Sequence, residues 1–289
     1  MTTREEWIAG ARPKTLPAAI APVLVGTAFA GYNANAINFF LALIVGVGLQ
    51  IGVNYANDYS DGVRGTDKDR VGPMRLVGSG AATPEAVKKA AIIAISIAAL
   101  AGALLAVRTS YLLLLVGALS ILAAWTYTGG PKPYGYFALG EVMVFIFFGL
   151  VATLGTYYVH LQSLSFEVLL ASFAMGSLAC AILALNNLRD LTKDKEAGKN
   201  TLAVRIGDKR TRNFFQALLF APLAIALALL PNSLYFLITF IALPQILKVA
   251  SSVRGGATGA ALIELLVKTG RIQIIYALSL SLAVLLNAR

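Results

Sequence analysis

The chain has 289 residues, of which 58% are hydrophobic and 13% are charged, and its mean hydropathy is +0.75. Because soluble domains carry about 25% charged residues, this composition excludes an ordinary soluble protein and a disordered chain. A single cysteine and a single histidine exclude an internal disulfide framework and argue against histidine-based metal or nucleophilic sites, which leaves a polytopic helical membrane protein with net charge +10.

Uncharged runs long enough for a membrane-spanning helix, which needs about 20 mostly apolar residues, recur along the chain. The first run, Thr15–Asn57, accommodates two spans with a turn at Gly31–Asn38, and Pro231-Asn232-Ser233 divides a later run into two spans. The runs after Asn57 are 90–107, 109–131, 142–166, 168–188, the divided run 213–247, and 272–288. We therefore predict an all-α protein with nine transmembrane helices.

The basic residues predict the orientation of these helices. With nine spans, all but two of the 24 Lys and Arg residues lie on one side, and the exceptions are Arg108 and Arg289. Basic residues concentrate in cytoplasmic loops, so the N-terminus is expected in the cytoplasm and the C-terminus outside, with the chain in the cell membrane. The net positive charge is thereby accounted for without a nucleic-acid partner.

Half of the 14 acidic residues lie in two short stretches, NYANDYSDGVRGTDKDR (Asn54 to Arg70) and NNLRDLTKDKEAGKNT (Asn186 to Thr201). Carboxylates at the end of an apolar span are costly and indicate function. The i, i+4 spacings of Asn57 with Asp61, and of Asn186 with Asp190 and Asp194, place each set on one helix face. Because Mg²⁺ prefers oxygen ligands and often binds one or two carboxylates with substrate phosphates, these stretches predict Mg²⁺ sites.

The two acidic stretches occupy equivalent places in the predicted order of helices. Each follows the helix that opens a group of four, which predicts one domain over 1–289 with two similar halves of roughly 38–160 and 167–289. Basic residues between the acids could bind the oxygens of a diphosphate. The candidates are Arg64, Lys68, Lys132 and Lys199.

ANDYSDGVRGTDKDRVGP and NNLRDLTKDKEAGKNTLAVRIG resemble the two Asp-rich motifs of the UbiA superfamily of intramembrane aromatic prenyltransferases. RPKTLPAAIAPVLVG, DRVGPMRLVGSG and YTGGPKPYGYFALGEV resemble its menaquinone branch, the 1,4-dihydroxy-2-naphthoate prenyltransferases. The chain departs from the superfamily pattern at Gly65, where many members carry an acid.

This resemblance implies a fold of nine helices around a central cavity that opens toward the cytoplasm. It implies Mg²⁺-dependent transfer of a polyprenyl group from an allylic diphosphate to dihydroxynaphthoate, with decarboxylation to demethylmenaquinone. The expected metal ligands are Asn57, Asp58, Asp61, Asn186, Asp190 and Asp194. The four aspartates and Glu141 are the expected catalytic residues, and Arg12, Lys14 and Tyr134 are the expected acceptor-binding residues.

Three alternatives are open to the sequence. Within the superfamily, the acceptor could be another aromatic compound such as 4-hydroxybenzoate. A cation-coupled secondary transporter is disfavoured because transporters place ionisable residues near the bilayer midplane, whereas here they lie at the predicted cytoplasmic ends of spans. A transferase acting on a nucleotide-activated lipid is disfavoured because its acidic motif occurs once rather than at two matched positions.

Overall fold

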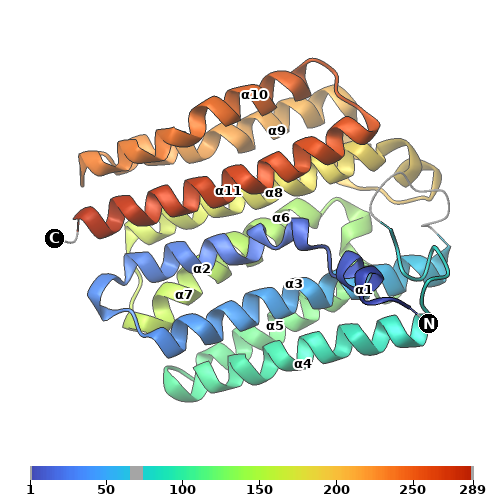
Figure 1. Cartoon of the computed structure of the whole chain (residues 1–289), viewed down its shortest axis with the longest axis horizontal. Helices are drawn as coiled ribbons and strands as arrows, with labels where there is room; N and C mark the ends of the chain where they lie inside the picture. The colour runs from blue at the N-terminus through green and yellow to red at the C-terminus, as the bar shows by residue number, and fades with distance from the viewer. Residues whose placement is uncertain (1, 66–73, 288–289) are drawn as a thin grey trace.

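The computed structural model describes residues 2–65 and 74–287, and its regular elements in these ranges are all helical. The helices lie side by side in one bundle and alternate in direction, so that α1 and the last turn of α11 lie at opposite ends (Figure 1). The elements are α1 (Arg4–Ala11), η1 (Pro13–Thr15), α2 (Pro17–Phe29), η2 (Gly31–Asn33), α3 (Ala36–Arg64), α4 (Pro84–Arg108), α5 (Leu112–Thr126), η3 (Tyr134–Phe137), α6 (Gly140–Val144), η4 (Phe145–Val151), α7 (Ala152–Leu161), α8 (Phe166–Glu196), α9 (Leu202–Leu229), η5 (Leu234–Ala242), α10 (Leu243–Arg254) and α11 (Gly259–Asn287).

In the described part of the chain, seven helical segments are long and apolar enough to cross a membrane. They are α3, α4, α6 to α7, α8, α9, η5 to α10, and α11. Two shorter apolar helices, α2 and α5, have 13 and 15 residues, or about 20 Å and 22 Å at 1.5 Å per residue, against a hydrocarbon core of about 30 Å. The predicted all-α membrane architecture is confirmed, and the count of nine crossings stays a prediction.

Several helices extend beyond the uncharged runs that predicted them. The last helix begins at Gly259 rather than near residue 272, and α8 continues to Glu196 rather than ending near residue 188. The predicted turns are close to their observed places: Phe29 ends α2, and α3 begins at Ala36. The charged residues that follow Leu188 up to Glu196, and those of α11 that precede Ile272, therefore lie on helices and not in loops.

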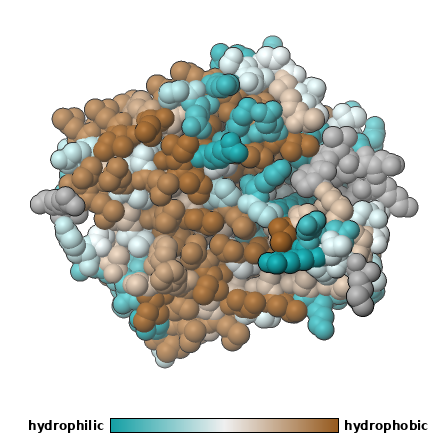
Figure 2. Space-filling view, viewed as in Figure 1, coloured by the Kyte–Doolittle hydropathy of each residue, from teal (hydrophilic) through white to brown (hydrophobic). Residues whose placement is uncertain are grey.

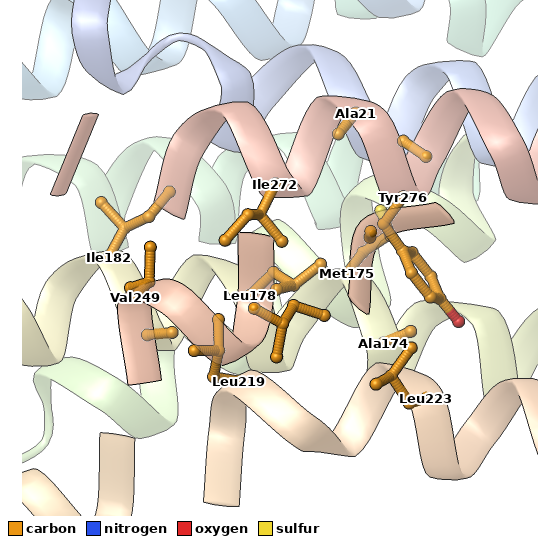
Figure 3. Packing of buried hydrophobic residues seen from close by; sticks show 14 of the residues in the cluster. Ala21, Ala174, Met175, Leu178, Ile182, Leu219, Leu223, Val249, Ile272 and Tyr276 are labelled. Carbon is orange, nitrogen blue, oxygen red and sulfur yellow. The ribbon is translucent and has the colours of Figure 1, made fainter. Parts of the chain in front are cut away.

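A large apolar core joins α8, α9, α10 and α11, and α2 packs against it (Figure 3). Met175 and Leu178 of α8 lie between Leu219 of α9 and Ile272 of α11, and Ala21 of α2 lies above them. In the most apolar 18-residue stretch of α8, 78% of the residues are buried, against 33% in the corresponding stretch of α4. Burial on nearly all sides fixes α8, and with it the residues at its carboxyl end.

The surface of the bundle is apolar over much of its side, and polar residues gather toward the end at which α1 lies (Figure 2). The carboxyl ends of α3 and α8, which bear the acidic stretches, lie at this same end (Figure 1). The division into halves 38–160 and 167–289 stays a prediction, which a superposition of one half on the other would test.

Candidate functional site

The first part of each acidic stretch forms the last turns of a long helix, α3 or α8, and the two parts line one cavity. Asn57 and Asp61 lie in α3, while Asn186, Asp190 and Asp194 lie in α8, and all five contribute to a cavity of about 850 Å³. The i, i+4 spacings place each set on the cavity-facing side of its helix. The structure thus brings together residues more than 100 positions apart in the sequence.

Asp61 is the centre of the first set. Its carboxylate accepts a hydrogen bond from the Tyr136 hydroxyl at 2.6 Å and pairs with the Lys199 Nζ at 3.0 Å and an Arg75 guanidinium nitrogen at 3.7 Å. One helical turn earlier, the Asn57 Oδ1 accepts from the Thr128 hydroxyl at 2.7 Å. Asp61, Arg75 and Lys199 are all buried, so these charges stand in an environment where electrostatic attraction is strong.

Arg189 organises the second set. Its guanidinium donates to both carboxylate oxygens of Asp190, at 2.8 Å and 2.6 Å, and to the Asn186 Oδ1 at 2.7 Å. This forked geometry is characteristic of arginine with a carboxylate. Each acidic motif therefore has a buried cation on its central aspartate, Lys199 and Arg75 in one case and Arg189 in the other.

Asp58, expected as a metal ligand, lies elsewhere. Its side chain is not on the cavity wall; it is 1% exposed, and its two oxygens accept from the backbone N–H groups of Leu76 at 2.8 Å and Val77 at 3.0 Å. Asp58 follows Asn57 directly, so it points to a different side of α3. The observed contacts give Asp58 the role of anchoring the segment that carries Arg75.

The predicted diphosphate-binding residues have different positions. Lys199 lines the cavity, with its Nζ 4.8 Å from the centre of the Tyr136 ring. Arg64 is not on the cavity wall and instead donates to the carbonyl oxygens of Thr128 and Gly130. Lys132 is exposed and also off the wall. Lys68 lies outside the described residues.

Two cations on the cavity wall, Arg75 and Arg189, were not among the sequence candidates. Arg189 is adjacent to Asp190 and three residues from Asn186, so its spacing was a usable signal. Arg75 carried no such signal, because its approach to Asp61 depends on the fold of the segment after α3.

The predicted acceptor-binding residues Arg12, Lys14 and Tyr134 all line the cavity. The Tyr134 hydroxyl donates to the Ala123 carbonyl at 2.9 Å, and the nearby Tyr127 also lines the cavity. Burial raises the pKa of both phenols above their ordinary value of about 10. A phenol is neutral at physiological pH already at its ordinary pKa, so both residues offer hydroxyl groups and the π-faces of neutral rings.

Glu141 lies behind the wall, with Asn187 between it and the cavity. Its Oε1 accepts from the Asn187 Nδ2 at 2.8 Å, and its buried Oε2 makes no hydrogen bond in the described structure. Asn187 lines the cavity and Glu141 does not. Glu141 is thus placed to orient Asn187.

Beyond the polar end, the cavity wall is mainly apolar. On α3 the lining residues extend from Asp61 back to Ala42, about 28 Å along the helix axis at 1.5 Å per residue. Val45 and Leu49 of α3 belong to this part of the wall, and side chains from other helices complete it, namely Leu113, Val116, Phe147, Phe148 and Val159. The cavity is therefore charged at one end and mainly apolar along the rest.

The oxygen donors at the charged end fit a hard divalent cation. They are carboxylates and side-chain amides, the ligand types Mg²⁺ prefers. Among the described residues, no three Asp, Glu, His or Cys side chains form a ready-made metal cage. Mg²⁺ keeps waters or substrate phosphates in its shell and is often bound by one or two protein carboxylates.

Known proteins resemble this chain in sequence and in fold. A family model described as the UbiA prenyltransferase family matches residues 19–261. A 1,4-dihydroxy-2-naphthoate octaprenyltransferase of Mycobacterium tuberculosis is 47% identical over 97% of this chain and 97% of its own length. One from Escherichia coli is 42% identical over 85% and 84%. A solved UbiA homolog from Archaeoglobus fulgidus, bound to GPP and Mg²⁺, has a TM-score of 0.67 at 14% identity, covering 96% of this chain and 99% of that one, and shows the shared fold.

Proposed function

The chain belongs to the UbiA prenyltransferase family, and we propose that it transfers a polyprenyl group from an allylic diphosphate to 1,4-dihydroxy-2-naphthoate. Carbon dioxide is lost, and the immediate product is the reduced, diol form of demethylmenaquinone. The acceptor is supported by relatives whose printed names state it and which match almost the whole chain. The observation that carries the reaction is the cavity, with oxygen ligands and buried cations at one end and an apolar wall beyond.

We assign the metal ligands to the cavity-facing members of the two motifs, Asn57, Asp61, Asn186, Asp190 and Asp194. Mg²⁺ bound there supplies Lewis-acid stabilisation of the departing diphosphate. A family structure bound to GPP and Mg²⁺ supports this choice of ion.

The buried cations bind and neutralise the diphosphate. Lys199, Arg75 and Arg189 now pair with Asp61 and Asp190, and they lie on the same wall that a diphosphate would contact. Each can donate to non-bridging oxygens, and these bonds strengthen as negative charge gathers on the leaving group.

The rest of the cavity controls the carbon chemistry. The carbon–oxygen bond to the diphosphate breaks, the ring carbon that bears the carboxylate bonds to the allylic carbon, and the bond from this ring carbon to the carboxylate breaks, which releases carbon dioxide and restores aromaticity. The apolar wall keeps water from the allylic cation. The neutral rings of Tyr127 and Tyr134 offer faces that stabilise it.

The chain is a multi-pass membrane protein. We propose nine crossings, with α2 and α5 as the two short ones, and a site that faces the cytoplasm in the cell membrane. The end of the bundle that holds the acidic motifs also gathers the polar surface (Figure 2), and the basic residues concentrate in the segments predicted at that end.

Turnover by the purified protein in detergent tests the proposal. With Mg²⁺, farnesyl or geranylgeranyl diphosphate and dihydroxynaphthoate, we expect prenylated naphthoquinol and released carbon dioxide, and excess chelator should stop both. Product from 4-hydroxybenzoate alone would keep the mechanism and change the acceptor. Absence of any Mg²⁺-dependent diphosphate binding would overturn the proposal and favour a transporter.

The length of prenyl chain accepted is expected to depend on Gly155. This residue lines the cavity about 20 Å along the helical run from Glu141, and a Cβ built on it meets no atom within 4 Å. Gly155→Phe should fill this space and lower kcat/KM for geranylgeranyl diphosphate by at least about tenfold, roughly 1.4 kcal/mol. A geranyl tail, two isoprene units shorter, should be turned over at nearly the original rate.

Gly155→Ala is the matched control, because its methyl group fits the open space. This variant should leave kcat/KM unchanged for both geranylgeranyl and geranyl diphosphate. An equal loss for both diphosphates in Gly155→Phe would mean that the tail does not reach this part of the cavity.

A further inference from the structure

Four polar side chains of α3 line the cavity in one row, Gln50, Asn54, Asn57 and Asp61. Their spacings of four, three and four residues keep them on one helix face. Asn57 and Asp61 belong to the acidic motif, whereas Asn54 and Gln50 lie one and two turns further toward the apolar part, respectively, and have no role in the reaction described above. Both are buried, with 8% and 4% of their surface exposed.

The hydroxyl of Thr15 fixes how these two amides are turned. It donates to the Arg12 carbonyl at 2.9 Å and accepts from the Gln50 Nε2 at 3.0 Å and the Asn54 Nδ2 at 3.2 Å. A hydroxyl has one proton and two lone pairs, so all of its capacity is used. The Asn54 Nδ2 also donates to the Ala11 carbonyl at 2.9 Å, and a carbonyl can only accept. The amide nitrogens therefore face η1, and the amide oxygens face away from it.

The two amide oxygens are left for a ligand. Neither the Gln50 Oε1 nor the Asn54 Oδ1 makes a hydrogen bond in the described structure. Both oxygen atoms keep some accessible surface. They are therefore reachable from the cavity, and each can accept. Leaving a buried acceptor without a donor is unfavourable, so this site favours a ligand that brings hydroxyl protons and disfavours one that brings only anionic oxygens.

We propose that Gln50 and Asn54 recognise the ring hydroxyls of the aromatic acceptor and thereby select a 1,4-diol over acceptors with a single hydroxyl. The inference rests on the proposed function and specifies the acceptor end of that site. Residues four apart are about 6 Å apart along a helix axis, a separation that suits two hydroxyls on opposite sides of one ring. Arg12 and Lys14, which shortly precede Thr15 and line the cavity, supply positive charge for the ring carboxylate.

The pair is tested by removing one hydroxyl from the acceptor and one amide from the protein. Dihydroxynaphthoate is compared with its two monohydroxy analogues, in wild type and in the near-isosteric variants Gln50→Met and Asn54→Leu. Removing a hydroxyl lowers kcat/KM by one factor in wild type and by another in the variant. The ratio of these two factors cancels the electronic effect of the missing hydroxyl on the ring. We expect a coupling of at least about tenfold in acceptor kcat/KM for one analogue with each variant, while the KM for the prenyl diphosphate stays within about twofold.

Losses in the variants that are the same for the diol and for both analogues would overturn the inference. So would an equal rise in the KM for the diphosphate. Thr15→Val gives an independent check, because it releases both amides without changing them and should raise the acceptor KM, whereas Thr15→Ser keeps the hydroxyl and should not. Turnover of the diol by wild type reports separately on the proposed function.

Discussion

Asp61→Asn and Asp190→Asn are each expected to lower turnover by about a thousandfold or more, close to 4 kcal/mol of transition-state stabilisation. Each change removes one negative charge from the oxygen set at the charged end of the cavity. Mg²⁺ then binds more weakly, and the diphosphate loses the positive charge of the metal that holds it in place. The measurements are single-turnover rates and Mg²⁺-dependent binding of a labelled prenyl diphosphate.

These variants also leave buried cations without a full countercharge. Lys199 and Arg75 pair with Asp61, and Arg189 pairs with Asp190, and breaking a buried ion pair is destabilising. Asparagine keeps one oxygen for hydrogen bonding and is preferred to alanine for this reason. A modest fall in the melting temperature is expected beside the loss of turnover.

Asp208→Asn is the matched control for this experiment. Asp208 also pairs with an arginine, Arg212, at 2.7 Å, but its side chain is 56% exposed and lies off the cavity wall. Surface pairs contribute little, so turnover should stay within about twofold of wild type. Wild-type rates in Asp61→Asn and Asp190→Asn would show that the two motifs do not hold the metal.

The periodicity of the acidic motifs could be predicted from sequence because it is a local property. Once α3 and α8 continue through the charged residues, the spacing of Asn57 and Asp61, and of Asn186 and Asp190, places each pair on one face. What remained hidden was the rotation of each helix about its axis, which decides that Asp61 faces the cavity and that Asp58 faces the segment after α3. Packing against distant residues sets this rotation, and no spacing within α3 reports it.

The ends of the helices were predicted poorly for a related reason. Charged residues mark the limits of the predicted spans, but α11 extends back to Gly259 and carries Glu264 and Lys268 as an ion pair of 2.6 Å with an i, i+4 spacing. Such pairs support a helix in water. A helix can therefore continue out of its apolar run, and charge alone marks where lipid ends and not where the helix ends.

Asp58→Ala is expected to lower both stability and turnover, for a reason different from that of Asp61. Its carboxylate accepts the backbone N–H groups of Leu76 and Val77, and each buried donor left without a partner costs about 1–3 kcal/mol. Losing both should lower the melting temperature by about 5 °C or more. Arg75 lies next to this anchor and should move from Asp61, which reduces turnover as well.

Asp58→Asn separates anchoring from metal binding, because it keeps one acceptor oxygen for the segment. If Asp58 acts as an anchor, the remaining turnover should show the wild-type dependence on Mg²⁺ concentration, and only the maximal rate and the melting temperature should fall. A raised Mg²⁺ requirement, like that of Asp61→Asn, would instead make Asp58 a ligand and would mean that its carboxylate leaves Leu76 and Val77 when substrate binds. Asp58 and Asp61 are three residues apart on α3, yet their asparagine variants are expected to differ in one Mg²⁺ titration of turnover. Asp61→Asn should raise the Mg²⁺ requirement, and Asp58→Asn should not.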